Sequence, residues 1–364
     1  MTAVHVRFHN PFPPHQIIAQ TRAVEGSLSY GWVLGQPAEA HFRISRGDVL
    51  VTEQPEVFAS FPMVTLERDD GFLPWVGFMG PMNGRLSDPV MGFTAYCHGR
   101  TLFAEGRTKK SSNESSAAAG THIIETFQEA AARGEPPLLV SLGSVGAGPP
   151  ITFTPKAESL LEFLRTMAEF SDWEWGFRYE VTRQYVRTKL LFQKRLGFDR
   201  RNEVVFQEGV AFKEAGFTRS PEGAFAASLA VGGTGTFKDR PAQQVNAAGR
   251  DDTGITGNIA GALAGVPTSP ALMGTRVVVE QSVKNADALT AAARRSLRDP
   301  DLLRERHVLE LVEANIDMDK LEIGSFYGIN FKNLDFGLKK EGVVRCLSLD
   351  LGEDGIVRMA AEAA

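Results

Sequence analysis

The sequence predicts a mainly β protein with α+β parts, in which two β-barrel regions flank a smaller α/β unit. Apolar and polar residues alternate with period two in short segments from residue 25 to residue 97, and turn residues separate these segments, as in barrels and sandwiches. Two amphipathic helix patterns follow in the middle of the chain. The period-two pattern then returns between His307 and Leu349. The length of 364 residues predicts two or three domains.

Composition places the chain among globular proteins and argues against a dedicated nucleic-acid binder. Hydrophobic residues make up 43% and charged residues 23% of the chain, which excludes broad disorder. The net charge of -5 opposes the clustered lysines and arginines on which nucleic-acid affinity depends. An acidic surface would let DNA slide through a channel without binding. Cys97 and Cys346 are too few for a disulfide scaffold or a zinc site, and we expect both to be small core residues.

Residues 1–20 are expected to form an extended N-terminal arm. Pro11, Pro13 and Pro14 fix their backbone angles and lack an N–H donor, so the segment is either a disordered tail or an arm that orders against a neighbouring subunit. It lacks the apolar core of a signal peptide. No apolar run reaches membrane-spanning length, so we expect a protein without a membrane anchor that is made in a cytoplasm.

Residues 21–106 are predicted to form the first β-barrel region. Val49 and Val51 are expected in one of its strands. A long hairpin is predicted over residues 63–79, with its turn at Asp70 and Gly71, because an Asp-Gly pair between alternating segments is a strong turn signal.

Residues 107–198 are predicted to form the α/β unit, which begins with an exposed linker over residues 106–120. One helix is expected over residues 121–134. A second helix is expected to be capped by Thr154, with Pro155 at its first position. Two strands after this helix are predicted to form a hairpin that packs on it.

Residues 199–364 are predicted to form the second β-barrel region. Residues 238–270 contain no aromatic residue and are expected to form an inserted functional or mobile loop. A helix is predicted over residues 285–298. The antiparallel strands that follow are expected to include Leu321 and Ile323.

Candidate chemical sites are few, and each has a structural interpretation that we favour. Gly232, Gly233 and Gly235 lack the lysine of a phosphate-binding loop, which favours a glycine-rich bend between strands. Glu158 and Glu162 lie one helical turn apart, as a solvated helix face does more often than a hydrolase cleft.

Two further sets of side chains are also read as structural. Trp173 and Trp175 could stack against a sugar, yet their alternation favours half-buried core. His5, His9 and His15 do not have the spacing of a helical metal pair. We therefore expect no catalytic, cofactor-binding or metal-binding site.

The order of these parts resembles a known family, the hub proteins at the tips of bacteriophage tails, which includes the matching part of type VI secretion spikes. Four stretches carry the resemblance: GSLSYGWVLGQPAEAHFRIS with GDVLVTE, SLLEFLRTMAEFSDWEWGFRY, FDRRNEVVFQEGVAFKEAGFTRSPEGAFAASLAVGGTGTF, and VVVEQSVKNADALTAAARRSLRDP followed by LEIGSFYGINF. Glu208 and Gly209 stand at the family's Glu-Gly turn, and Gly324 stands at the turn before its exposed strand.

The resemblance implies two tail-tube-like β-barrels and a structural role in the virion. It implies a homotrimeric hub at the tail tip of a phage or a gene transfer agent, which joins the sixfold tube and distal tail ring to the threefold spike or fibre and surrounds the DNA path. Such a particle is assembled in the bacterial host. The expected assembly contacts are Asp70, Gly71, Phe326, Tyr327 and Phe331. The alternatives are a tail-associated cell-wall hydrolase and a carbohydrate-binding tail module.

Overall fold

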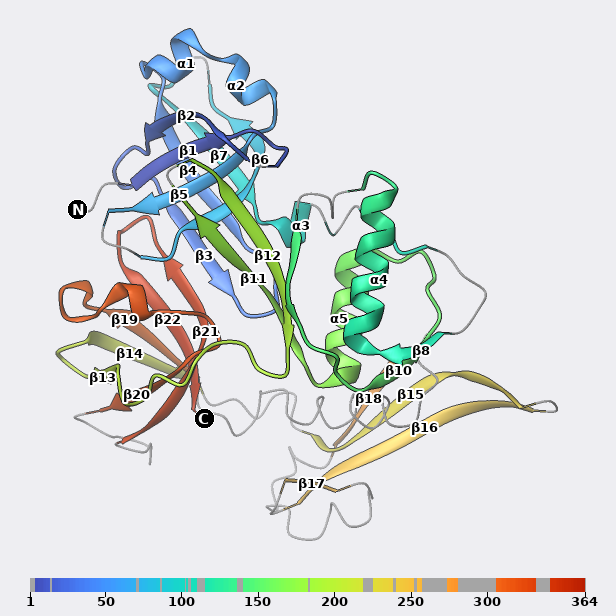
Figure 1. Ribbon diagram of the computed structural model, residues 1–364. Helices are drawn as coiled ribbons and strands as arrows, with labels where there is room; N and C mark the ends of the chain where they lie inside the picture. The colour runs from blue at the N-terminus through green and yellow to red at the C-terminus, as the bar shows by residue number, and fades with distance from the viewer. Residues whose placement is uncertain are drawn as a thin grey trace.

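The computed structural model shows a mainly β protein whose two longer helices, α4 and α5, lie in the middle part of the chain (Figure 1). The residues that it describes are 4–13, 15–69, 72–85, 87–101, 103, 106–109, 115–135, 140–182, 184–218, 225–237, 240–251, 254–256, 274–280, 306–331 and 341–363. One large sheet runs through both strand-rich regions, and the two longer helices lie to one side of it (Figure 1). The predicted fold class, mainly β with α+β parts, is confirmed.

The N-terminal region contributes seven antiparallel strands to the large sheet. Their spatial order is β3-β4-β7-β6-β5-β1-β2. The hairpin predicted over residues 63–79 is confirmed by the pairing of β5 with β6. The strands are β1 Val4–His9, β2 Ile17–Arg22, β3 Ser29–Val33, β4 Glu39–Ser45, β5 Met63–Arg68, β6 Trp75–Asn83 and β7 Val90–Tyr96.

The arm expected over residues 1–20 is a β-hairpin of this sheet, so that expectation is wrong. β1 pairs with β2 on one side and with β5 on the other. Val6 and Phe8 are fully buried. Pro11 and Pro13 fall in the turn between the strands, where a missing N–H breaks no ladder bond. The alternating apolar residues of β1 therefore outweigh the proline signal.

Val49 and Val51 lie in a helix rather than in a strand. The Asp48 side chain accepts a hydrogen bond from the Leu50 N–H at 2.8 Å and caps helix α1, Val49–Glu53. A second short helix, α2, spans Glu56–Ala59. The cap gives a hydrogen-bond partner to a backbone N–H at the start of the helix. It thereby favours a helix over the strand that the β propensity of the valines predicts.

The middle of the chain is built on two helices. Helix α4, Ala119–Ala132, confirms the first predicted helix, and the left-handed Gly134 follows its end. Strand β8, Ser115–Ala118, leads into α4 and pairs with β10, Pro150–Phe153. The expected linker over residues 106–120 therefore ends in regular structure.

Helix α5 spans Leu160–Ser171 and begins later than predicted. Its cap is Ser159, not Thr154: the Ser159 hydroxyl accepts from the Glu162 N–H, and the Glu162 carboxylate accepts from the Ser159 N–H, both at 3.1 Å. This capping box satisfies two backbone donors reciprocally. The predicted cap at Thr154 is wrong because Thr154 directly follows strand β10 instead.

The hairpin predicted after α5 is confirmed. β11, Glu174–Val181, pairs antiparallel with β12, Val186–Gln193, and β9, Ser141–Val145, adds a parallel strand to β12. The hairpin lies along the strands of the N-terminal region (Figure 1). Gln16 and Tyr185 form an isolated antiparallel bridge at the far end of the hairpin.

The C-terminal region continues the large sheet. Its order is β14-β19-β22-β21, and β20 pairs with β21 and β13. Leu321 and Ile323 follow a 3-10 helix, Met318–Lys320, and precede β20, so their predicted strand is wrong. The strands are β13 Val205–Gln207, β14 Phe212–Thr218, β19 Arg306–Leu311, β20 Phe326–Asn330, β21 Glu341–Leu351 and β22 Val357–Ala363.

The two strand-rich regions share one sheet and one core instead of closing separately. β3 pairs with β21, with Tyr30 opposite Leu351 and Trp32 opposite Leu349. A single cluster of buried side chains draws on both regions, including Phe42, Phe206 and Leu349. Cys97 and Cys346 are free thiols buried in this core, as predicted.

A separate four-stranded sheet departs from the predicted second barrel. β15, Phe225–Phe237, pairs with β16, Arg240–Asp251, and with β18, Gly274–Glu280, and β17, Gly254–Thr256, pairs with β16. β16 and β17 occupy part of the expected loop over residues 238–270, which is therefore not one continuous loop. The register of β15 shifts between Val231 and Thr234, at the glycine pair predicted to bend the chain. The helix predicted over residues 285–298 lies outside the described residues.

Candidate assembly interface

The aromatic residues expected to contact other subunits belong mainly to the core. Tyr327 is fully buried, and Phe331 is 6% exposed. The ring of Phe326 is partly buried, and the Arg345 guanidinium lies over it, 5.4 Å from the ring centroid. Asp70 and Gly71 lie outside the described residues. The assignment of Tyr327 and Phe331 as surface contacts is wrong because both side chains face the inside of the sheet.

Tyr327 holds the loop that precedes its own strand. Its hydroxyl donates to the Lys320 carbonyl at 2.9 Å and accepts from the Glu322 N–H at 2.7 Å. Burial raises the pKa of the Tyr327 phenol, so it stays a neutral donor. These hydrogen bonds hold residues 320–322 against strand β20. The stretch LEIGSFYGINF, which ends at Phe331, therefore stabilises the fold of this region.

Within the described residues, each end of the large sheet is a strand that has a partner strand on one side only. β2 and β14 are the terminal strands of the main path. Among the strands of the described chain, β2 pairs with β1 alone and β14 with β19 alone. Free N–H and C=O groups along such an edge can pair with a strand of another chain. Ile18, in β2, is 45% exposed.

Two exposed phenylalanines lie near the same end of β1. Phe12 is 68% exposed and Phe61 is 66% exposed. His9 pairs with both Ile17 and Met63, so the β1–β2 turn and the residues before β5 meet at this end of the sheet. Contact of such large apolar side chains with water is unfavourable. Their exposure therefore favours a partner that covers them.

A buried ion pair fixes the α/β unit to the C-terminal sheet. The Arg345 guanidinium donates to both carboxylate oxygens of Glu174, at 2.8 and 2.6 Å. Glu174 also accepts from the Leu196 N–H at 2.8 Å, and Arg345 also donates to the Gly324 carbonyl at 3.1 Å. Each polar group in this seam therefore has a partner, as burial of charge requires.

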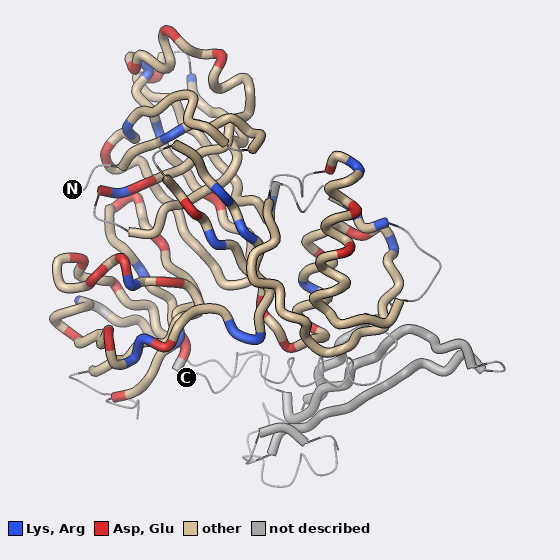
Figure 2. Tube along the Cα trace, viewed as in Figure 1, with Lys and Arg blue, Asp and Glu red and all other residues tan. Residues whose placement is uncertain are grey.

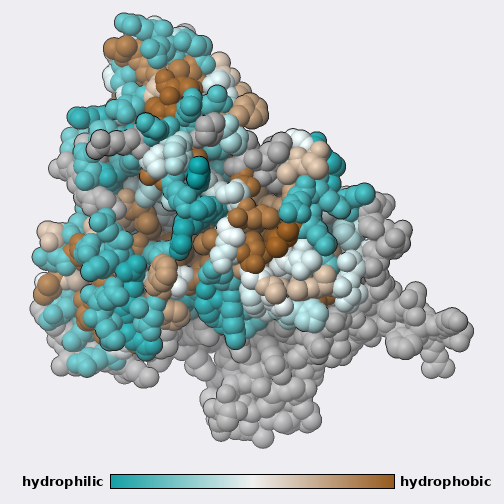
Figure 3. Space-filling view, in the orientation of Figure 1, coloured by the Kyte–Doolittle hydropathy of each residue, from teal (hydrophilic) through white to brown (hydrophobic). Residues whose placement is uncertain are grey.

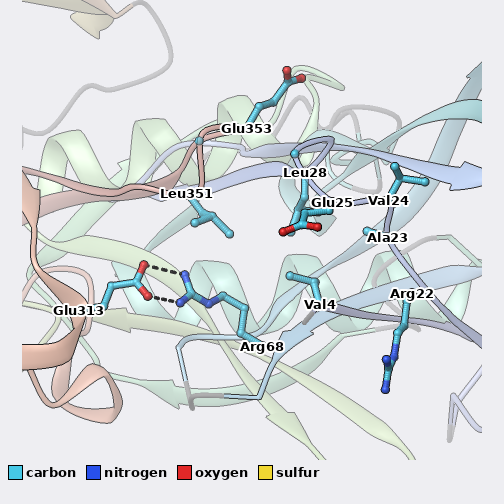
Figure 4. A pocket seen from close by; sticks show the side chains of 13 residues that line it. Val4, Arg22, Ala23, Val24, Glu25, Leu28, Arg68, Glu313, Leu351 and Glu353 are labelled. Atoms are coloured by element: carbon cyan, nitrogen blue, oxygen red, sulfur yellow. Dashed lines mark hydrogen bonds and ion pairs between the residues drawn. The ribbon is translucent and has the colours of Figure 1, made fainter. Parts of the chain in front are cut away.

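A second ion pair lies beside a pocket of about 320 Å³ between the two strand-rich regions. Arg68, from the end of β5, and Glu313 point toward one another and are joined at two points, one of them 3.0 Å long (Figure 4). Val4, Leu28 and Leu351 also line this pocket (Figure 4). The pair ties distant parts of the chain together.

Another pocket, of about 310 Å³, lies where all three parts of the chain meet. Its wall includes Trp32 from β3, Tyr179 from β11 and Ile323 before β20. The rings of Trp32 and Tyr179 are tilted against each other, with centroids 5.0 Å apart. Most of the lining is apolar, and an ion pair between Arg178 and Glu322, 3.5 Å long, also lies in its wall.

The surface offers no single basic or acidic face in the described chain. Figure 2 shows acidic and basic residues interspersed along both strand-rich regions. Figure 3 shows apolar surface gathered near the place where the β11–β12 hairpin approaches α4 and α5. This distribution suits contacts between proteins better than binding to a nucleic-acid backbone.

The residues weighed as chemical sites have structural roles. Glu162 belongs to the capping box of α5. Trp175 is 3% exposed in the second core, and Trp173 stacks on Phe192 with centroids 5.3 Å apart, so the core interpretation of both indoles is confirmed. Within the described ranges, the side chains of His, Cys, Asp and Glu form no group of three or more that could hold a metal ion. None of the helices in the described part of the chain is long and apolar enough to cross a membrane.

Sequence reasoning missed the open edges and the internal ion pairs. The apolar alternation of β2 is weak, and nothing in its sequence says which strand lies beside it. Glu174 and Arg345 are far apart along the chain, and neither residue type signals burial by itself. The signal that could have found the hairpin was the pair Val6 and Phe8, which alternate like core residues.

Comparison with known proteins identifies the fold. No protein-family model and no curated protein sequence matches the chain. The prophage tail protein gp18 from Listeria monocytogenes EGD-e has a similar structure, with a TM-score of 0.57 and 10% identity over 99% of this chain and 94% of that one. The tail protein from Neisseria meningitidis MC58 gives a TM-score of 0.58 and 11% identity over 100% of this chain and 96% of that one.

A component of the type VI secretion system is also similar. The E. coli c3393 protein, described as similar in structure to T4 bacteriophage tail proteins gp27 and gp5, gives a TM-score of 0.51 and 9% identity over 93% of this chain and 72% of that one. The resemblance inferred from the sequence is thus confirmed for the fold, which spans the whole chain. At these identities the similarity establishes architecture and not activity.

Proposed function

We propose that this chain is a non-enzymatic hub at the distal end of the tail of a phage or of a phage-derived particle. It forms a homotrimeric ring that joins the sixfold tail tube and distal tail ring to a threefold spike or fibre. The observation that carries the proposal is the full-length match of the fold to tail proteins. The buried ion pair between Glu174 and Arg345, which fixes two parts of the chain to each other, supports the same structural role.

Symmetry explains why such a hub contains two strand-rich regions. A trimer presents six such regions to a sixfold tube and three whole subunits to a threefold spike. The joint through β3 and β21 holds the two regions of one chain in a fixed relation, as a ring that couples two symmetries requires. The β2 and β14 edges lie at opposite ends of one sheet and suit head-to-tail contacts that close a ring.

The DNA path needs a surface that does not retain DNA. The chain carries a net charge of -5, and its charges are interspersed (Figure 2). Phosphates would therefore meet little net attraction and could pass without specific binding.

The test is the solution mass of the full chain by light scattering over a wide concentration range, with electron microscopy of the same sample. We expect the mass of three chains and a ring with a central hole. Immunogold labelling of purified particles should place the chain at the tail tip. A monomer at every concentration, combined with label along the tube or no label, would overturn the proposal.

A further inference from the structure

Three buried histidines lie along the contact between the β11–β12 hairpin and the N-terminal sheet. His9 in β1 and His98 at the start of helix α3, His98–Thr101, are fully buried, and His15 in the β1–β2 turn is 2% exposed. His98 is distant in the sequence from His9 and His15. The proposed hub role does not use them, and burial of three titratable rings in one place needs a separate explanation.

His9 connects β1 to the turn and to β5. Its Nδ1 donates to the His15 carbonyl at 3.0 Å, and its Nε2 lies 3.1 Å from Thr65 Oγ1. Thr65 Oγ1 lies 3.2 Å from a carboxylate oxygen of Glu67. The Glu67 carboxylate is already paired with the Arg7 guanidinium at 2.5 Å. It is therefore not a free counter-ion for a protonated His9.

His98 connects α3 to the hairpin. Its Nε2 lies 3.1 Å from Thr188 Oγ1 on β12, and its ring packs against Phe78, Phe177 and Tyr179. Its Nδ1 is buried and has no hydrogen-bond partner among the described residues. A protonated imidazole carries an N–H on both nitrogens. Protonation of His98 would therefore bury a charged donor without an acceptor.

His15 couples the other two rings and carries backbone strain. Its φ of +53° lies in the left-handed region, which non-glycine residues rarely adopt. Its Nδ1 donates to the Asn10 carbonyl at 3.0 Å. A positive charge on His15 opposes protonation of both His9 and His98. Burial, with that charge, lowers the pKa of His9 to about 4 and of His98 to about 3.

Among the residues that the structure describes, the other groups that face the cluster offer no unpaired anion. On the β1 and β5 side these are the Arg7–Glu67 pair and Thr65. On the hairpin side they are Tyr179 and Thr188, and burial holds the pKa of the Tyr179 phenol well above its usual range. Burial also raises the pKa of Cys97, so its thiol stays neutral.

The two ends of the hairpin are held by different chemistry. β11 begins at Glu174, whose ion pair with Arg345 anchors it to the C-terminal sheet. The turn at the other end meets the N-terminal sheet through the bridge between Gln16 and Tyr185. Loss of the histidine contacts would release the turn end first and leave the anchored end in place.

We propose that the cluster of His9, His15 and His98 is an acid-sensitive latch between the β11–β12 hairpin and the N-terminal sheet. The latch is closed while the imidazoles are neutral. Protonation makes the cluster a group of repelling buried cations, and the β1–β2 turn and the hairpin turn separate. The opening is local because the Glu174–Arg345 pair, which anchors the other end of the hairpin, remains outside the cluster.

Hydrogen exchange of the full chain, read by mass spectrometry from pH 7.5 to pH 4.5 and corrected for the intrinsic effect of pH, tests the latch. His9 and His98, whose pKa values are lowered in the closed state, should each raise the open population by up to about tenfold per pH unit below pH 6.5. We expect the extra exchange in residues 10–16 and 179–188. His98→Gln and His9→Gln should each flatten this response, and His41→Gln, which removes an exposed histidine, should leave it unchanged. Equal responses in all four proteins would overturn the latch.

A disulfide clamp provides the test if a histidine variant does not fold. Cysteines in place of Gln16 and Tyr185 would join the two sides of the bridge. The oxidised clamp should keep both segments protected at pH 4.5, and reduction should restore the acid response. The same exchange in the oxidised and reduced states, or simultaneous loss of protection over the entire chain, would contradict a local latch.

Discussion

The Arg345 guanidinium and the Glu174 carboxylate form a two-point ion pair that joins β21 to β11 in the interior of the protein. Their side chains are only 9% and 10% exposed. The Leu196 N–H and the Gly324 carbonyl complete the hydrogen bonds around them. The pair therefore fixes the α/β unit to the C-terminal sheet at one defined position.

Loss of this pair should strongly destabilise the protein. In Arg345→Ala the Glu174 carboxylate stays buried without its cation, so we expect the free energy of unfolding to fall by about 3–5 kcal/mol. Urea unfolding followed by circular dichroism measures the change. The control is Arg201→Ala, which removes an exposed pair with Asp199 and should leave the midpoint unchanged. A loss as small as that of a surface pair would contradict the role assigned to Arg345.

Two glycines at the same seam should tolerate no side chain. Gly197 and Gly324 have φ values of +86° and +82°. A Cβ on Gly197 would lie 2.3 Å from the carbonyl carbon of Gly324, and a Cβ on Gly324 would lie 2.7 Å from the Leu196 carbonyl oxygen. We expect Gly197→Ala to lower the melting temperature far more than Gly134→Ala, whose Cβ would meet nothing within 4 Å. Similar effects of the two substitutions would show that the backbones separate easily.

The cap of α5 should contribute measurably to stability. Ser159→Ala removes the acceptor of the Glu162 N–H, and we expect a loss of about 1 kcal/mol in urea unfolding. Thr154→Ala should have a smaller effect because Thr154 is not the cap of this helix. A larger loss in Thr154→Ala than in Ser159→Ala would indicate that Thr154 caps this helix, as the sequence predicts.

The stability of the whole chain should fall as the pH drops below 6.5. The folded-state pKa values of His9 and His98 are lowered from 6.5 to about 4 and about 3. The unfolded state therefore binds protons first, and stability that is complete above pH 6.5 is lost as the pH falls toward those values. At pH 5 we expect a loss of about 2 kcal/mol for each histidine.

Urea unfolding at pH 7.5 and pH 5 measures this loss. The double variant His9→Gln/His98→Gln is the matched comparison. Burial raises the pKa of Asp350, so protonation of Asp350 opposes the effect of the histidines. This contribution is the same in the parent protein and in the variant. The same pH dependence in both proteins would show that the histidines titrate normally.

Assembly should depend on the open β2 edge. Ile18→Lys places a charge on this edge strand, where Ile18 is 45% exposed, and charge on an edge opposes pairing with another chain. We expect the trimer to dissociate while the circular dichroism spectrum stays unchanged. The control is Val49→Lys, which is 59% exposed in α1, and light scattering gives the mass. An intact Ile18→Lys trimer would exclude β2 from the contact.

The sequence alone determined the fold class and many of its elements. Alternation in segments such as residues 63–79 and 343–349 predicts strands because every second side chain must face the core. The apolar stripe of residues 121–134 predicts helix α4, because apolar side chains spaced three or four residues apart lie on the one helix face that packs on the core. The order of these elements was enough to indicate the family fold, which the structural comparisons confirm.

Only the tertiary structure decided which elements adjoin. It placed β1 and β2 in the sheet, joined β3 to β21, and buried Tyr327 and Phe331. It also joined His9 to His15, placed His98 against Thr188, and paired Glu174 with Arg345. Periodicity reports which face of a strand is apolar, whereas the neighbour of that face depends on contacts between residues far apart in the chain. Those contacts are set by the packing of the complete chain, so no local pattern contains them.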